Sequence, residues 1–217
     1  MKEKKKRLDD FLNRHTLLAH IPLSLGMIFA LEWMSRHSFM GACSFVSDYP
    51  GAYLFNCYLV FVCFTPVLLV KRRTFLRMIM SAVFVMLGVV NGIVLLNRVS
   101  HFGFTDLNMV VDLLTMQNTN YFSAGQGAFS VAAILLYACF LIHIFRNEPK
   151  KEYKSGFAVR LVIVIVAFAT LPLVTLVLRK ADIVSSYYGN LAQGYAENGY
   201  IYSFASSVFD RGMKVPD

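Results

Sequence analysis

Four polar side chains occur close together in residues 97–112, between two apolar segments: Arg98, Ser100, His101 and Asp106. A guanidinium group is planar and pairs well with phosphate, and Ser and His supply further hydrogen-bonding groups. Such a cluster, where a membrane segment leaves the bilayer, could contact the headgroup of an anionic lipid. A structural alternative is that Arg98 and Asp106 anchor the interface or pair with each other.

Three polar residues of the apolar segments are candidates for a role: Glu32, Arg36 and Asn91. A charge at the centre of a bilayer costs ~2.5–3.5 kcal/mol on insertion scales, so an acid there needs a partner. Arg36 follows Glu32 at the i, i+4 spacing of a helical ion pair. We expect this local pair rather than a ligand site. Asn91 is expected to hydrogen-bond to a neighbouring helix.

The sequence contains no recognisable catalytic or metal-binding pattern. Its cysteines and histidines are scattered, at Cys43, Cys57, Cys63, Cys139, His15, His20, His37, His101 and His143. Because no Cys-x-x-Cys pair occurs, neither a zinc site nor a disulfide framework is predicted. Gly88 and Gly92 have the spacing of a helix-packing face rather than of a phosphate-binding loop. We therefore expect no catalytic residue, metal or cofactor in this stretch of chain.

The composition predicts an integral membrane protein. Of 217 residues, 57% are hydrophobic and 16% are charged, and the mean hydropathy is +0.55, which excludes an ordinary soluble domain. The net charge is +8, but the basic residues cluster between apolar runs, which argues against a nucleic-acid partner. No cleavage site follows the first apolar segment, so a retained anchor is expected.

Five apolar segments predict an all-α membrane protein with five transmembrane helices. They are residues 17–36, 51–70, 78–97, 122–145 and 157–178. About 20 helical residues at 1.5 Å each cross ~30 Å of hydrocarbon. Residues 1–180 are thus a predicted transmembrane domain, and residues 181–217 are predicted to be an extracytoplasmic linker.

Two further regions have helical patterns without the length of a span. Residues 105–116 carry apolar residues at a helical period and are too short to cross, which favours an interfacial helix or a shallow re-entrant turn. Past Lys180 the chain is rich in tyrosine. Tyrosine concentrates where a side chain is wet at one end, so we expect one or two amphipathic helices on the outer leaflet.

The basic residues predict the orientation of the chain. Fifteen of the 21 Lys and Arg residues fall in the N-terminal segment and in alternate connections. Short cytoplasmic loops accumulate these residues. The N-terminus is therefore expected in the cytoplasm and the C-terminus outside a plasma membrane.

Two motifs in the chain resemble those of a known family. Arg98-Val-Ser-His-Phe102 followed by Asp106-Leu107 resembles the Arg-x-Thr-Pro-Phe…Asp-Leu pattern in the membrane domain of lipoteichoic acid synthases. Gly199-Tyr-Ile-Tyr-Ser-Phe204, with Lys214-Val-Pro-Asp217 after it, resembles the segment that leads into the catalytic domain of that family. His101 stands where the family usually has proline.

The resemblance implies a membrane domain that anchors an enzyme of the Gram-positive type of cell envelope and presents lipid to it. By family, a sulfatase-like extracellular domain, absent from these residues, would use a threonine nucleophile and a divalent metal such as manganese. It would transfer glycerol phosphate from phosphatidylglycerol in cell wall biogenesis. A subunit or fragment of a small lipid flippase or transporter is the alternative, although the spans show no internal repeat and few interruptions.

Overall fold

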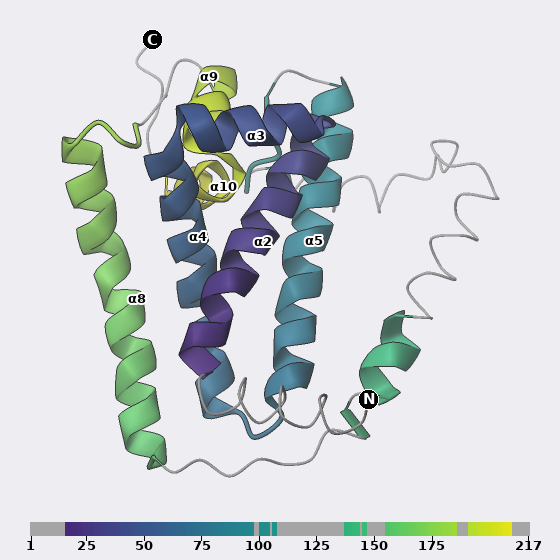
Figure 1. Ribbon diagram of the computed structural model, residues 1–217, viewed down its shortest axis with the longest axis vertical. Coiled ribbons are helices and arrows are strands. Elements are labelled where there is room, and N and C mark those ends of the chain that lie inside the picture. Colours follow the sequence, from purple (N-terminus) through teal and green to yellow (C-terminus); the bar gives the residue numbers. More distant parts are fainter. Residues whose placement is uncertain are drawn as a thin grey trace.

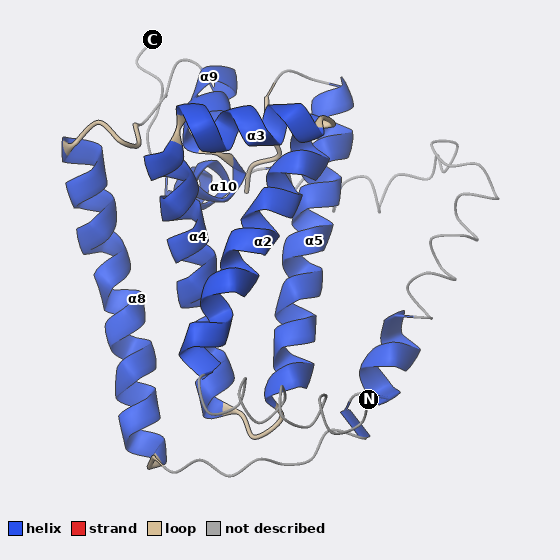
Figure 2. Cartoon of the chain, viewed as in Figure 1, coloured by secondary structure: helices blue, strands red, loops and turns tan. Residues whose placement is uncertain are grey.

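The computed structural model describes residues 16–97, 100–104, 106–107, 137–143, 145–146, 155–185 and 191–209. Every regular element in this part of the chain is helical (Figure 2). Four helices are long and apolar enough to cross a membrane: Thr16–Arg36, Pro50–Leu69, Arg73–Leu96 and Phe157–Lys180. The described part of the protein is therefore all-helical, with four helices suited to a membrane.

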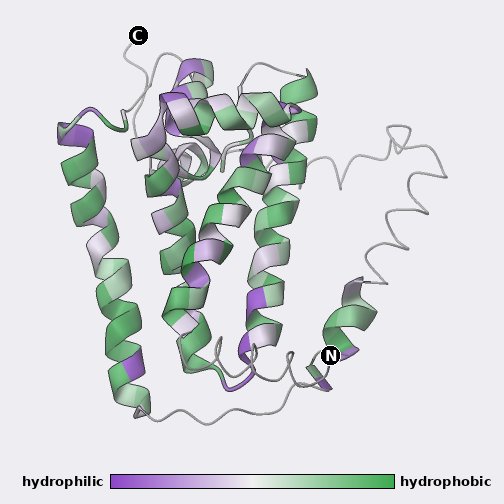
Figure 3. Cartoon of the chain, in the orientation of Figure 1, coloured by the Kyte–Doolittle hydropathy of each residue, from purple (hydrophilic) through white to green (hydrophobic). Residues whose placement is uncertain are grey.

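Helices α2 (Thr16–Arg36), α4 (Pro50–Phe64) and α5 (Arg73–Asn97) stand side by side as the central bundle (Figure 1). Helix α8 (Phe157–Lys180) stands beside α4. Apolar residues cover most of the length of α8 (Figure 3), and Val164 is its one buried residue. A helix apolar all round with so little burial suits a lipid environment.

Four of the five predicted spans match these four helices, with small differences at their ends. The third span begins at Arg73 rather than Met78, because the helix continues through Arg73 and Arg77 beyond its apolar part. In the second, α4 passes into a 3₁₀ turn, η1 (Thr65–Leu69), where Pro66 has no N–H to donate. The Val62 carbonyl accepts both the Thr65 backbone N–H and, at 2.7 Å, the Thr65 hydroxyl.

The predicted fourth span, residues 122–145, lies largely outside the described residues. Its described part, residues 137–143 and 145–146, is helical. The Tyr137 hydroxyl donates to the Met78 carbonyl at 2.8 Å, which places this piece beside the first part of α5. The count of five spans stays a prediction. The interfacial helix over residues 105–116 is likewise mostly outside the described part, with only residues 106–107 helical.

Helix α2 packs closely on α5 through the two predicted small residues. A Cβ added at Gly88 would lie 2.5 Å from the Leu31 Cδ2 atom, and one at Gly92 would lie 2.8 Å from the Met34 carbonyl oxygen. The His37 ring nitrogen Nε2 lies 2.9 Å from the Gly92 carbonyl oxygen. Gly88 and Gly92 thus form the helix-packing face that the sequence predicts.

Three short helices gather at one end of the bundle, which we call the α9–α10 end (Figure 1). Helix α3 (Phe39–Asp48) runs from the end of α2 to the start of α4 and packs on both, and α9 (Leu191–Asn198) and α10 (Tyr200–Phe209) lie at the same end. No helix was predicted at residues 39–48. Ser38 caps it, since its hydroxyl accepts the Gly41 N–H at 3.1 Å.

The described part of the segment past Lys180 forms two helices, but their tyrosines do not lie on a wet surface as the sequence suggests. Tyr195, Tyr200 and Tyr202 are buried, with Tyr200 fully so. They belong to the same hydrophobic core as Phe45 and Phe55. The amphipathic faces of α9 and α10 are therefore turned toward α2 and α4.

Candidate functional site: a helix break held by membrane-helix side chains

The centre of the α9–α10 end is a break between two helices, which we call the Gly199 turn (Asn198, Gly199 and Tyr200). Gly199 has φ +80°, a left-handed conformation that glycine adopts without strain. A Cβ there would lie 2.8 Å from the Asn56 Nδ2 atom and from the Phe45 ring, and 3.1 Å from Glu32 Oε1. Both the backbone angle and the space therefore require glycine.

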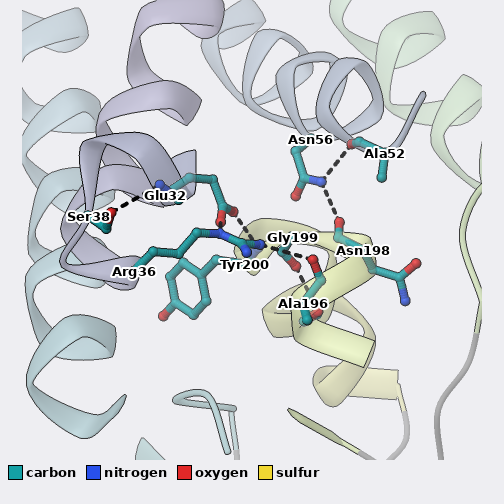
Figure 4. Close-up of polar contacts among 11 residues, drawn as sticks. Glu32, Arg36, Ser38, Ala52, Asn56, Ala196, Asn198, Gly199 and Tyr200 are labelled. Carbon is teal, nitrogen blue, oxygen red and sulfur yellow. Dashed lines mark hydrogen bonds and ion pairs between the residues drawn. The ribbon is translucent and has the colours of Figure 1, made fainter. Parts of the chain in front are cut away.

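Side chains from the membrane helices cap the first turn of α10. The first N–H groups of a helix have no partner within it. Gly199 occupies the N-cap position but has no side chain to offer. Instead Glu32 Oε1 accepts the Tyr200 N–H at 2.8 Å, and Asn56 Oδ1 accepts the Tyr202 N–H at 2.8 Å. Helix α10 is thus capped from α2 and α4, and Figure 4 shows the contact from Glu32.

The last carbonyls of α9 are satisfied from the same two helices. Arg36 Nη2 donates to the Ala196 carbonyl at 3.0 Å, and Asn56 Nδ2 donates to the Asn198 carbonyl at 2.7 Å. A helix has positive character at its first residues and negative character at its last. The acid therefore faces the start of α10 and the base faces the end of α9, so both charges complement the helix ends.

The predicted pair of Glu32 and Arg36 is present. Arg36 Nε donates to Glu32 Oε2 at 2.9 Å, and the Glu32 side chain is 2% exposed. The Arg36 guanidinium also lies 4.6 Å from the Phe45 ring centre and 5.2 Å from that of Tyr195. The spacing alone could not reveal that Glu32 also binds a backbone N–H from a distant segment, which makes the pair a connection between helices.

The segment after α8 is tied to the same turn. Asn198 Nδ2 donates to the Ser185 carbonyl at 2.7 Å, and its Oδ1 accepts the Ser185 N–H at 3.1 Å. At the end of α8, Arg179 Nε donates to the Tyr202 hydroxyl at 2.7 Å. These contacts fix α9 and α10 directly to the last long helix.

Residues 100–104 and 106–107 pack against α9 and α10. The Phe102 and Phe204 rings are stacked with centres 6.3 Å apart, and the Phe104 N–H donates to the Ser207 hydroxyl at 2.8 Å. The His101 ring is stacked on Tyr195 with centres 6.0 Å apart. Two stretches far apart in sequence therefore form one packed unit.

The predicted headgroup residues differ in their burial and contacts. Arg98 lies outside the described residues. Ser100 is partly buried. His101 is only 6% exposed. Asp106 Oδ2 accepts the Gly103 N–H at 2.8 Å within its own turn. Lipid contact by Arg98 stays a prediction, and so does its pairing with Asp106. His101 packs inward rather than facing the surroundings.

The predicted hydrogen bond from Asn91 to a neighbouring helix is not the one that the structure contains. Asn91 is fully buried, but its Oδ1 atom accepts the Phe102 N–H at 2.8 Å rather than a group on a neighbouring helix. The connection that follows α5 folds back over the end of the helix. This brings the Phe102 N–H within reach of the Asn91 side chain. Asn91 therefore orients the connection that carries His101 and Phe102.

Sequence reasoning missed Asn56, although a signal was present. Asn56 is a polar residue within an apolar span, and it is fully buried. Such residues in membrane helices are costly unless they find partners. One of its partners is local, since Nδ2 donates to the Ala52 carbonyl at 2.7 Å. The others are backbone groups of α9 and α10, which no local pattern around Asn56 indicates.

Burial raises the pKa of the Tyr195 and Tyr200 hydroxyls well above the usual range for tyrosine. Both side chains therefore stay neutral at physiological pH. Among the described residues, no group of three or more His, Cys, Asp and Glu side chains could hold a metal ion. In the described part of the α9–α10 end, buried side chains cap α9 and α10 and aromatic rings pack against them. These contacts suit the attachment of both helices to the bundle.

No protein-family model, curated protein or solved structure matches this chain. The similarity to lipoteichoic acid synthases therefore rests on the two motifs in the sequence.

Proposed function

We propose that this chain is the membrane-anchoring and lipid-presenting part of a lipoteichoic acid synthase-like enzyme. One observation supports the proposal most. The two motifs that carry the resemblance, around Phe102 and Phe204, pack on each other at the α9–α10 end. In this proposal, the motif around Phe102 supports the motif around Phe204, which leads toward a catalytic domain. The packing of the two motifs then serves one function.

The Gly199 turn supplies a physical basis for anchoring. A flexible linker would let a following domain move freely from the membrane. Here Glu32, Arg36 and Asn56 bind the backbone on both sides of Gly199. A domain that follows α10 would therefore be held near one end of the bundle.

In the proposal, this end faces outward from a plasma membrane and the N-terminus is cytoplasmic. The basic residues favour this orientation. Phosphatidylglycerol of the outer leaflet would then reach the bundle by lateral diffusion, with its phosphate at the level of the α9–α10 end. Arg98, Ser100 and Asp106 are the proposed residues near the headgroup, and His101 of the same proposed set packs inward on Tyr195.

The chemistry itself is assigned to a domain outside this chain. By resemblance, that domain carries the threonine nucleophile and a divalent metal such as manganese, which would stabilise charge on the transferred phosphate. The residues described here would orient the lipid and hold that domain near the bilayer. The activity of the whole protein is part of the proposal.

The proposal is tested with the complete reading frame that contains this chain. The purified protein is reconstituted into vesicles with phosphatidylglycerol labelled on an acyl chain, with and without manganese. We expect metal-dependent release of labelled diacylglycerol, and none from residues 1–217 alone. A reading frame that encodes no such domain, or no release, would contradict the proposal.

A matched set of variants tests the lipid-presenting role. Arg98→Lys keeps the charge but loses the planar fork, so turnover should fall partially, and Arg98→Ala should lower it further. Lys180→Ala is the control for charge at the same end. The same vesicles test the flippase alternative. Movement of labelled lipid between leaflets by residues 1–217 alone would favour that reading.

A further inference from the structure

An aromatic cluster lies on the outside of the bundle beside α3. The Trp33 and Phe39 rings meet edge to face with centres 5.5 Å apart, and Phe29 meets Phe39 at the same distance. Trp33 is 50% exposed and Phe39 is 54% exposed. We call Phe29, Trp33 and Phe39 the aromatic patch. It joins the side of α2 to the start of α3.

Helix α3 has two unlike flanks. Phe39, Cys43 and Val46 follow the spacing of one helical face and continue from the aromatic patch. Gly41, Ser44 and Asp48 lie on the other flank, and Ser44 and Asp48 are exposed. Ala42 and Phe45 are buried between the flanks against the bundle. Met40, which is 73% exposed, lies on the outward face opposite the buried residues. The helix therefore has one apolar flank, one polar flank and a buried base.

We propose that α3 lies in the membrane interface at the α9–α10 end, with the aromatic patch in contact with lipid. The apolar flank is continuous with the exposed apolar surface of α2, which is one of the candidate spans. Tryptophan and other aromatic residues concentrate at the boundary between headgroups and acyl chains. An amphipathic helix with polar residues opposite its aromatic side lies in that plane.

The length of α2 agrees with this placement. Seventeen residues separate Thr16 from Trp33, or about 26 Å along a helix axis. The hydrocarbon core is about 30 Å thick. If Trp33 lies at one boundary, Thr16 and the nearby Arg73, whose guanidinium donates to the Thr16 hydroxyl at 2.9 Å, lie close to the other.

The inference fixes the depth of the Gly199 turn without depending on the proposed enzyme. Glu32 precedes Trp33 in the chain, so the buried acid lies at the level of the headgroups rather than at the bilayer centre. The cost of a charged group falls sharply there. The polar side chains that cap α10 therefore lie at a depth where a charged group costs little free energy.

Residues 1–217 already contain the probe, because Trp33 is their only tryptophan. The protein is reconstituted into vesicles whose lipids carry bromine near the headgroup, in mid-chain or at the chain end. We expect Trp33 fluorescence to lose most intensity with bromine nearest the headgroup and least with bromine at the chain end. Strongest quenching at the chain end, or none at any depth, would overturn the inference.

Three single-tryptophan variants in a Trp33→Phe background separate the two flanks. Phe39→Trp should be quenched by shallow bromine and little by aqueous iodide. Ser44→Trp, on the polar flank, should show the reverse. Met86→Trp, on an exposed site in α5, is the control and should respond most to deep bromine. Iodide quenching of Phe39→Trp would show that this flank faces water, and silence to both quenchers would show protein cover. Either result contradicts the inference.

Discussion

Helices α5 and α10 both pack on α2, but by different means. Helix α5 is held by close approach along a seam, where Gly88 and Gly92 leave no room for side chains. Helix α10 is held at its first turn, where Glu32 accepts its backbone N–H. In lipid, apolar contact alone gives little drive for association, so shape along the seam and hydrogen bonds at the turn must supply it.

The difference teaches where single substitutions should act. The α2–α5 seam spreads its energy over many small contacts. The Gly199 turn concentrates its energy in a few polar atoms that are buried. Removal of one such atom leaves a partner without its hydrogen bond, which costs more than the bond itself contributed. The turn should therefore be the more sensitive region.

The largest effect is expected from Glu32→Ala. It leaves the Arg36 guanidinium without its carboxylate and the Tyr200 N–H without an acceptor. Loss of one partner from a buried pair costs ~3–5 kcal/mol. Glu32→Gln keeps an acceptor for Tyr200 and should cost less. The free energy of unfolding in mixed micelles measures both, with exposed Asp48→Asn as control. Equal stability of the Ala variant and the native chain would contradict the trans-capping role.

Gly199→Ala is expected to come next, at about 2–4 kcal/mol, from left-handed strain and overpacking together. Its Cβ would push against Asn56, Phe45 and Glu32, so α9 and α10 should separate from the bundle before the spans unfold. Limited proteolysis between residues 185 and 209 should become faster, while cleavage elsewhere is unchanged. Gly156→Ala, where nothing lies within 4 Å of an added Cβ, is the control.

The sequence predicted the long elements well, because their signal is local. Apolar runs of spanning length identified the four long helices, and the i, i+4 spacing identified the pair of Glu32 and Arg36. Membrane helices satisfy their own backbone, so their existence depends little on distant residues. The same independence explains why their ends were placed within a few residues.

The attachment of α9 and α10 could not be predicted in this way. The acceptors for the Tyr200 and Tyr202 N–H groups come from Glu32 and Asn56, far away in the chain. The tyrosine-rich composition predicted a wet surface, but contacts with α2 and α4 bury these tyrosines in the core. Helix α3 had local signals, Ser38 before it and Pro50 after it, but its short length hid them.

A smaller effect is expected at the seam. Gly92→Ala would place a Cβ 2.8 Å from the Met34 backbone oxygen, which cannot rotate away. Overpacking of this kind costs about 1–3 kcal/mol. Gly26→Ala is the matched control in the same pair of helices, because nothing lies within 4 Å there. Helix propensity alone should stabilise it by about 0.5–1 kcal/mol. Opposite signs for the two variants support close packing, and equal effects would contradict it.

The smallest effect is expected at a single neutral hydrogen bond between α4 and α8. The charged contact of α8 with the same span lies elsewhere, where Arg160 Nη1 donates to the Leu68 carbonyl of η1 at 2.8 Å. The Tyr58 hydroxyl and Thr170 Oγ1 form the neutral hydrogen bond between α4 and α8. Such bonds in membrane proteins average about 0.6 kcal/mol, because the separated helices also find partners. Tyr58→Phe should therefore lower the free energy of unfolding only slightly.

Thr170→Val tests the same bond from the other side, and the double variant gives the coupling energy. Thr170 also donates to the Ala167 carbonyl at 2.6 Å, so its single substitution should cost somewhat more than Tyr58→Phe. Non-additivity between the two single variants would show that the bond joins the helices. A loss at Tyr58 as large as that at Glu32 would mean that α8, too, depends on concentrated polar contacts, and the contrast drawn between the seam and the Gly199 turn would no longer describe this bundle.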